Sequence, residues 1–257
     1  MATQTVLITG ANRGIGKGFT STFLSQPGTT VIAAVRDPAH ETVKALSSLP
    51  TAEGSKLITV KLDSGVFADA AAAVATLKSE HGISALDIVI ANAGIGKNGS
   101  TVRNTSAANM TEHFNVNTIG PIVLFQATAD LLQASKSGNP KFVALSTFIG
   151  SIGGIDTLIG LGFPHTSSPY GGSKAALNWF VRRLTFEEPW LTSFVFHPGL
   201  VETDMAADAI ADTGLELKNI GAITVDTSVA GMTKTILAAT RETSGTFQNY
   251  DGAINPW

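Results

Sequence analysis

A tyrosine and a lysine four residues apart, Tyr170 and Lys174, are the side chains of this sequence best suited to acid–base chemistry. On a helix this spacing places both on one face, one turn apart. A free phenol has a pKa of about 10, and a neighbouring ammonium group favours the phenolate and lowers that pKa. The pair is therefore a candidate for moving a proton to or from a carbonyl oxygen. The alternative is an ordinary helix in which the tyrosine packs and the lysine is solvated.

A glycine-rich segment near the N-terminus is a second candidate site, and it reads Thr9-Gly10-Ala11-Asn12-Arg13-Gly14-Ile15-Gly16. Glycines allow a tight turn and a close approach of the backbone to a pyrophosphate, which the amides at the start of a following helix can hold. The spacing differs from the Gly-x-Gly-x-x-Gly of the common dinucleotide fingerprint. A strand–helix turn with ordinary caps is the alternative, but the position directly after the first expected strand favours cofactor binding.

Composition bounds the class of protein. The 257 residues are 44% hydrophobic, which predicts one globular domain over residues 1–257. A net charge of −3 without a basic cluster argues against nucleic acid as a partner. The chain has no cysteine, and its five histidines lack metal-ligand spacing, so we expect no metal site. No apolar run spans a bilayer, and the early first strand leaves no room for a signal peptide, so we expect a cytoplasmic protein.

Strand and helix patterns alternate along the whole chain. Apolar runs predict strands at 5–9, 30–35, 56–62, 86–90, 141–145 and 192–196, and a weaker one at 245–248. Helices are expected at 14–25, after Asp37-Pro38, at 66–81, over much of 107–135, at 170–187 and at 226–240. Continuously apolar strands indicate an α/β fold, a doubly wound parallel sheet with helices on both faces. Ligands of such sheets bind at the carboxyl ends of the strands, where both motifs fall.

Together, the glycine loop and the Tyr170/Lys174 pair resemble the short-chain dehydrogenase/reductase family, which implies a Rossmann fold. Further motifs occur in the family's order: Asp63 after the third strand, Asn92-Ala93-Gly94 with Ala91 in place of the first asparagine, Asn117, and Pro198-Gly199 followed by Val201 and Thr203. The resemblance implies an adenine contact for Asp63 and nicotinamide contacts for the 198–203 segment. A narrower similarity to fungal norsolorinic acid ketoreductases is carried by 145–147, 182–192 and Pro256-Trp257.

The resemblance also implies the catalytic roles. Tyr170 is expected to give a proton to the developing alkoxide, and Lys174 to bind the nicotinamide ribose and lower the tyrosine's pKa. Asn117 is expected to hold a water that links Lys174 to solvent. The family's catalytic hydroxyl lies three residues before a glycine, and Gly150 then selects Thr147. Ser146 stays the alternative.

The residues after the second strand bear on the choice between NADP and NAD. An acid at this position binds the ribose 2′-hydroxyl, whereas an arginine accommodates a 2′-phosphate. Here Val35 is followed by Arg36, and Arg13 in the glycine loop could add a second positive charge. Asp37 could pair with Arg36, or cap the next helix and leave Arg36 free. The pattern favours NADPH.

Two segments are candidates for the substrate pocket. Residues 150–168 are longer than the family's usual spacing and are rich in glycine and apolar residues, and residues 200–223 could form a lid; a surface insertion and an ordinary amphipathic helix are the alternatives. The expected reaction is NADPH-dependent reduction of a small-molecule ketone, and the resemblance favours an aromatic polyketide. An oxidative NADP-dependent alcohol dehydrogenase and a catalytically silent NADP-binding regulatory protein are competing functions. The family commonly forms dimers or tetramers, but monomeric relatives also occur.

Overall fold

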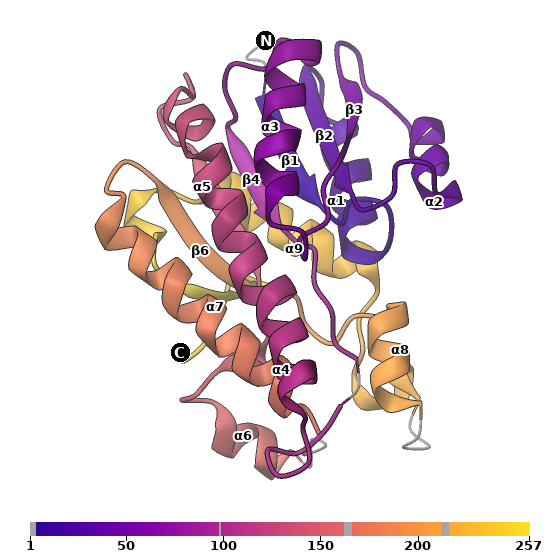
Figure 1. The fold of residues 1–257 in the computed structure, drawn as a ribbon, viewed down its shortest axis with the longest axis vertical. Coiled ribbons are helices and arrows are strands. Elements are labelled where there is room, and N and C mark those ends of the chain that lie inside the picture. Colours follow the sequence, from indigo (N-terminus) through magenta and orange to yellow (C-terminus); the bar gives the residue numbers. More distant parts are fainter. Residues whose placement is uncertain (1–3, 98, 162–165, 212–215) are drawn as a thin grey trace.

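The computed structural model describes residues 4–97, 99–161, 166–211 and 216–257 (Figure 1). Seven strands form one parallel sheet in the order β3-β2-β1-β4-β5-β6-β7. Their bounds are β1 (Gln4–Thr9), β2 (Thr29–Val35), β3 (Lys56–Lys61), β4 (Ile88–Ala91), β5 (Lys141–Leu145), β6 (Thr192–His197) and β7 (Phe247–Asn249). The order reverses between β1 and β4, which creates the switch point where ligands of open α/β sheets bind.

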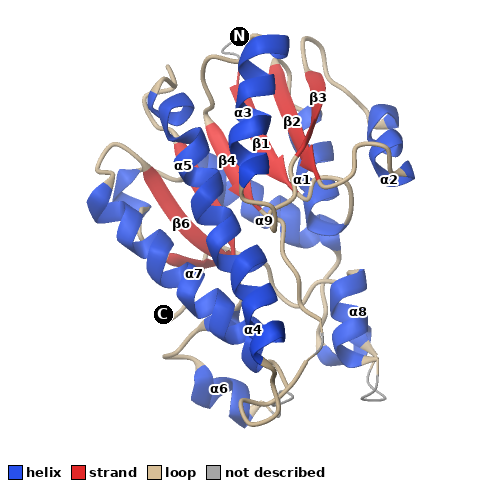
Figure 2. Ribbon diagram, in the orientation of Figure 1, coloured by secondary structure: helices blue, strands red, loops and turns tan. Residues whose placement is uncertain are grey.

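Helices cover both faces of the sheet (Figure 2). They are α1 (Gly14–Leu24), α2 (Glu41–Lys44), α3 (Ala68–His81), α4 (Ala107–Phe114), α5 (Gly120–Gln133), α6 (Ile155–Gly160), α7 (Ser168–Glu187), α8 (Asp204–Ile210) and α9 (Val225–Ala238). Shorter 3₁₀ turns lie at Ala45–Ser48, Phe148–Gly150, Leu217–Ile220 and Arg241–Thr243. In Figure 1, α3, α5 and α7 lie in front of the sheet and α1 and α9 lie behind it.

The core has two layers because successive strand side chains point to opposite faces. Leu7 of β1 packs in the layer under α3, α5 and α7, whereas its neighbours Val6 and Ile8 pack in the layer under α1 and α9. Both faces of the central strands are buried, which is why β4 and β5 are apolar almost throughout, whereas the edge strand β3 alternates buried and exposed residues. The doubly wound fold expected from the sequence is confirmed.

The long helix expected within 107–135 is broken into α4 and α5 by a π-helical turn, Asn115–Ile119. The main-chain N–H of Gly120 donates to the oxygen of Asn115, five residues back. Pro121, which follows, has no N–H to donate to the carbonyl of Asn117. Such turns inside helices often mark functional sites, and this one carries a predicted site residue.

Two further elements differ from the expectation. The helix after Pro38 begins at Glu41 and is one turn long, with the His40 side chain accepting a hydrogen bond from the main chain of Thr42. The segment 150–168 contains α6, which the sequence reading did not assign, and residues 162–165 of that segment lie outside the described residues. Within the described ranges, no helix is both long and apolar enough to cross a membrane, and no cluster of acidic or histidine side chains could hold a metal ion.

Candidate active site

Tyr170 and Lys174 lie one turn apart on α7, at the carboxyl end of the sheet. The Lys174 Nζ atom lies over the Tyr170 ring, 6.0 Å from its centroid. Lys174 is buried, and its Nζ donates a hydrogen bond of 2.7 Å to the main-chain oxygen of Leu145, the last residue of β5. The pair therefore sits on one helix face as the spacing predicts, and the lysine is anchored to β5.

Burial dominates the electrostatics of the pair. It raises the pKa of Tyr170 to about 12 and lowers the pKa of Lys174 to about 8. Both shifts have one cause, because a site poor in water disfavours the phenolate as well as the ammonium. Desolvation thus opposes the expected lowering of the tyrosine's pKa by the lysine, and that lowering stays a prediction.

The two adjacent hydroxyls after β5 have different partners. The Ser146 Oγ atom donates a 2.5 Å hydrogen bond to the Asn178 Oδ1 atom, so its proton is committed inside the core. The Thr147 hydroxyl accepts a bond of 3.3 Å from the main-chain N–H of Ile149, which leaves its own proton free to be donated. A Cβ atom on Gly150 would lie 2.8 Å from the Lys174 Cβ atom, so only glycine lets this turn pass so close to α7.

Asn117, in the π-helical turn, is fully buried and joins two segments. Its Oδ1 atom accepts a hydrogen bond from the main-chain N–H of Ile95, and its Nδ2 atom donates to the Ile95 oxygen, each at 2.9 Å. The Nδ2 atom also donates to the Ser173 Oγ atom at 3.0 Å. The amide thus fixes the loop after β4 to α7.

The lack of a side chain at Gly94 lets Asn117 and Lys174 lie close to the loop after β4. A Cβ atom there would lie 3.1 Å from the Asn117 Oδ1 atom and 3.5 Å from the Lys174 Nζ atom. The neighbouring Asn92 side chain donates to the main-chain oxygens of Thr9 and Gly10, at 2.8 and 3.3 Å. The expected Asn92-Ala93-Gly94 motif therefore joins the end of β4 to the glycine loop.

The glycine loop has the geometry that its spacing predicts. Gly10 and Gly14 adopt φ values of +62° and +49°, in the left-handed region that favours glycine. A Cβ atom on Gly16 would lie 2.2 Å from the Gly10 oxygen, so no other residue fits there. Arg13 begins α1 without capping it with its side chain. The first turn thus leaves N–H groups for an anion, and the loop fits a dinucleotide pyrophosphate.

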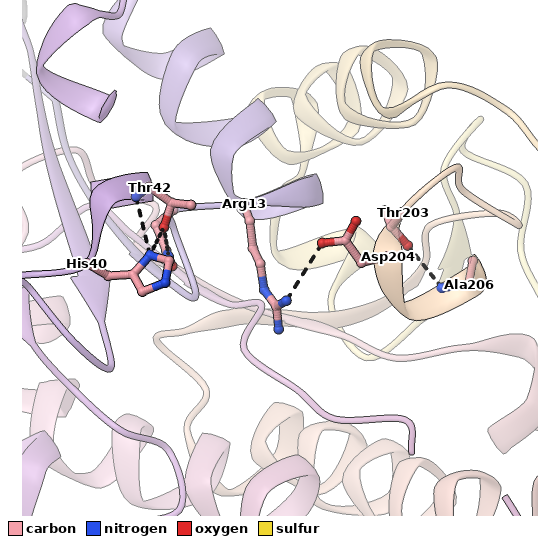
Figure 3. A network of polar contacts seen from close by, with 7 residues as sticks. Arg13, His40, Thr42, Thr203, Asp204 and Ala206 are labelled. Atoms are coloured by element: carbon pink, nitrogen blue, oxygen red, sulfur yellow. Dashed lines mark hydrogen bonds and ion pairs between the residues drawn. The ribbon is translucent and has the colours of Figure 1, made fainter. Parts of the chain in front are cut away.

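The charged residues beside this loop differ in their partners. Asp37 accepts a hydrogen bond of 2.9 Å from the main-chain N–H of Ala39, which closes a local turn, and within the described residues it forms no ion pair with Arg36. The cap of α2 is His40, so the expectation that Asp37 caps the next helix is wrong. Arg36 is exposed, and among the described residues it forms no ion pair. Arg13 pairs with Asp204 at 3.7 Å (Figure 3).

Asp63 follows β3, and its Oδ1 atom accepts a hydrogen bond of 2.9 Å from the main-chain N–H of Gly65. Its side chain therefore shapes the turn after β3. This bond leaves the other carboxylate oxygen for the adenine contact that the resemblance implies.

The segment after β6 passes over the glycine loop. Gly199 has a φ of +85°, and Val201 forms a bridge to Ile223. The Thr203 hydroxyl caps α8 by accepting from the main-chain N–H of Ala206 at 3.3 Å (Figure 3). A Cβ atom on Gly14 would lie 3.5 Å from the Thr203 methyl group, which brings α8 next to the loop.

Other contacts bring this segment to the catalytic residues. The Pro198 oxygen accepts a 2.6 Å bond from the Ser228 hydroxyl, which ties the segment to α9. A Cβ atom on Gly96 would lie 3.2 Å from the Met205 Sδ atom and 3.6 Å from the Tyr170 Cδ2 atom. Met205 thus lies beside the catalytic ring. Residues 212–215 of the expected 200–223 segment lie outside the described residues.

Sequence reasoning missed two buried polar residues on α7, Ser173 and Asn178. Asn178 follows Tyr170 and Lys174 at the same four-residue spacing, and that periodicity could have identified it. Ser173 carries no such signal, because serine is common on helices for many reasons. It is recognised only through its bond to Asn117.

Comparisons with known proteins agree with this geometry. The family model described as short chain dehydrogenase matches residues 4–214. The chain is 39% identical over 257 residues to the short chain dehydrogenase gsfK of Penicillium aethiopicum, covering 98% of this chain and 99% of the relative. It is 42% identical over 258 residues to the norsolorinic acid ketoreductase of Aspergillus parasiticus, covering 98% and 90%.

Among solved structures, an NADPH-bound carbonyl reductase from chicken fatty liver is 32% identical, with a TM-score of 0.85 over all of both chains. The chain therefore belongs to the short-chain dehydrogenase family and is an oxidoreductase of carbonyl and hydroxyl groups.

Proposed function

We propose that this enzyme is an NADPH-dependent ketoreductase that reduces a carbonyl of a small molecule, with a bulky aromatic polyketide as the favoured class of substrate. The observation that carries the proposal is that Tyr170 and Lys174 share one face of α7, with Lys174 bonded to the last residue of β5, two residues before the free Thr147 hydroxyl. Relatives named norsolorinic acid ketoreductase support the ketone as the reacting group.

Tyr170 would supply the proton that reduction needs. When bound, NADPH supplies a hydride to the carbonyl carbon, and the carbonyl oxygen then needs a proton. A phenol with a pKa raised to about 12 is protonated at neutral pH, which is the form that donates. An oxidative alcohol dehydrogenase would use the same groups in reverse, so oxidation of alcohols by NADP⁺ has to be measured to test that alternative. A silent NADP-binding protein would have no need of the donor set.

Thr147 and Lys174 complete the proposed mechanism. The Thr147 hydroxyl donates to the same carbonyl oxygen and stabilises the negative charge that develops there. One Lys174 N–H bonds to Leu145, which leaves two for the hydroxyls of the nicotinamide ribose. The Asn117 carbonyl, which has no N–H four residues ahead of it, is the proposed acceptor for a water that returns a proton through Lys174.

NADPH is the proposed cofactor because a free arginine faces the adenosine end. Arg36 forms no ion pair within the described ranges, and Asp37 bonds to the main chain of Ala39 instead. A planar guanidinium suits a 2′-phosphate and gains nothing comparable from a ribose hydroxyl. Gly10, Gly14 and Gly16 shape the proposed pyrophosphate cradle.

The motifs on either side would complete the cofactor site. Asp63 is proposed to contact the adenine. The 92–94 motif shapes the cleft, and Pro198 through Thr203 contact the nicotinamide half.

The described parts of 150–168 and 200–223 are proposed as walls of the substrate pocket. Met205 from α8 lies next to Tyr170, and α6 exposes Ile155 and Ile159 one turn apart. Apolar side chains at the edge of a site suit a planar aromatic ketone better than a sugar. A pocket of this kind explains why α6 keeps apolar residues without burying any of them.

Assembly and location are part of the same proposal. Trp179 and Phe186 of α7 are 61% and 64% exposed, and this surface fits a homodimer or, with a further interface, a tetramer. Sedimentation velocity of the wild type beside Trp179→Ser tests it, because a dimer interface on α7 predicts a shift toward monomer.

The cytoplasm, where NADPH is kept reduced, is the proposed location, and a fluorescent fusion with cell fractionation tests it.

The decisive test is NADPH consumption with a panel of aromatic ketones. We expect turnover with at least one polycyclic ketone, a product with one new hydroxyl group, and weak activity with NADH. Oxidation of the matching alcohols by NADP⁺ is measured in parallel. NADPH binding without turnover across the panel would support the silent regulatory protein instead.

A further inference from the structure

Asn12 of the glycine loop is bonded to a residue outside the loop. Its Nδ2 atom donates a 2.6 Å hydrogen bond to the Thr42 Oγ1 atom in the first turn of α2, thirty residues along the chain. Both side chains are partly buried. Asn12 was expected to touch the cofactor, but this bond directs its amide away from a phosphate and toward α2.

His40 fixes the direction of this contact (Figure 3). The His40 Nδ1 atom accepts a bond of 3.3 Å from the main-chain N–H of Thr42 and lies 2.9 Å from the Thr42 hydroxyl oxygen. The Asn12 Nδ2 atom can only donate, so the hydroxyl accepts from Asn12 and gives its own proton to His40. The result is a chain of donors that runs from Asn12 through Thr42 to His40, which places the histidine proton on Nε2.

This chain joins the two segments proposed to hold the cofactor's phosphates. The glycine loop cradles the pyrophosphate, and the 36–41 segment carries Arg36 for the 2′-phosphate. Every residue from 36 to 41 is exposed, so core packing does not hold this segment. Val43 of α2 and Leu46 of the 3₁₀ turn that follows are buried. The hydrogen-bonded chain is therefore a tether at the end that faces the cofactor.

We propose that Thr42 is a positioning residue for the cofactor: through Asn12 and His40 it sets the spacing between the glycine loop and the 36–41 segment. The inference rests on the proposed binding of NADPH. Without the tether, the two segments must be ordered by the cofactor, which costs affinity. The tether acts on the pyrophosphate and adenosine parts, which NADPH and NADH share, so its loss weakens both cofactors by the same factor.

The test is the dissociation constant of NADPH and of NADH, measured by titration of the tryptophan fluorescence. Thr42→Val removes the hydroxyl and keeps the shape, and we expect roughly tenfold weaker binding of both cofactors, as befits two lost hydrogen bonds. Thr42→Ser restores the hydroxyl and should restore affinity. The kcat at saturating NADPH should stay at the wild-type value, because the catalytic residues are untouched.

Two controls separate positioning from general stability. Thr240→Val removes a hydroxyl that caps the Arg241–Thr243 turn, and it should lower the melting temperature without changing either dissociation constant. In an Asn12→Ala background, Thr42→Val should add no further loss. Unchanged binding in Thr42→Val, additive losses in the double variant, or no rescue by serine would overturn the proposal. Failure of the wild type to bind NADPH would instead refute the proposed function.

Discussion

The proposed catalytic site and the segments proposed as pocket walls are held in contrasting ways. Lys174, Asn117 and Ser146 of the site are buried, and each is fixed by hydrogen bonds of 2.5 to 3.0 Å to β5, to the loop after β4 or to α7. The cover consists of the short helices α6 and α8, which bury no residue among those described. The contact of α8 with the glycine loop includes an exposed ion pair of 3.7 Å.

The difference teaches where precision is needed. A proton donor and a charge-stabilising hydroxyl must be placed before the substrate arrives, which explains why Tyr170 and Thr147 lie on α7 and directly after β5, next to groups fixed by hydrogen bonds. A cover has to open for a large substrate, and weakly held helices can do so at little free-energy cost. Substitutions of the buried site residues should therefore change kcat, and substitutions in α6 and α8 should change the binding of cofactor or substrate.

The largest expected effect comes from Tyr170→Phe. Removing the proton donor should lower kcat by about 10²- to 10⁴-fold, the usual contribution of general acid catalysis. The dissociation constant of NADPH should stay close to that of the wild type. Single-turnover oxidation of NADPH measures the rate, and its dependence on NADPH concentration gives the dissociation constant. A near-normal rate would remove Tyr170 from its proposed role.

Ser146 and Thr147 allow a sharper comparison, between two adjacent buried hydroxyls. Thr147→Val should lower kcat about 10²-fold, because a donor to the developing oxyanion is lost. Ser146→Ala breaks only the bond to Asn178, so we expect a loss of stability with kcat within about threefold of the wild type. Steady-state kinetics beside urea unfolding distinguishes the two, and the reverse order of kcat losses would assign catalysis to Ser146.

Arg36→Ala tests an exposed residue that is proposed to bind the cofactor and to take no part in the chemical step. Loss of a charge-assisted contact to the 2′-phosphate should weaken NADPH about 10- to 100-fold and leave NADH nearly unchanged. Arg103→Ala, a change at an exposed arginine in the loop before α4, is the matched control and should alter neither constant. Equal losses for NADPH and NADH in Arg36→Ala would refute phosphate recognition.

The burial of Lys174 should make the stability of the protein depend on pH. Its pKa is about 8 in the folded protein against an ordinary value of 10.5, so between these pH values the unfolded chain binds more protons. Stability should therefore rise as the pH increases from about 8 to 10, and this rise should be absent in Lys174→Met. Urea unfolding at pH 7 and pH 9.5 measures it. A wild-type stability that falls over this interval would contradict the burial argument.

The smallest effect is expected at the cover. Asp204→Asn frees Arg13 from an exposed ion pair worth little in water, so NADPH should bind about two- to fivefold tighter while NADH is unaffected. Asp208→Asn, one turn further along α8 and equally exposed, changes the charge in the same way and should have no such selectivity. A similar gain in both variants would show a general charge effect rather than competition for Arg13.

The sequence was sufficient for those parts that local chemistry determines. All seven strands, the glycine loop and the helix bearing Tyr170 lie where apolar runs and spacing predicted them. It was insufficient where distant segments decide. The π-helical turn carries Asn117, whose bonds to Ile95 join distant segments, and α6 is a short helix that buries none of its residues. The pKa of Tyr170 depends on burial, which no spacing reveals.

The most direct test of the central claim is a crystal structure with NADPH and a ketone product analogue. The account predicts that the oxygen of the analogue lies within hydrogen-bonding distance of both the Tyr170 hydroxyl and the Thr147 Oγ1 atom, with Ser146 still bonded to Asn178. An oxygen bound by Ser146, or a Tyr170 hydroxyl turned away from the cofactor, would contradict it.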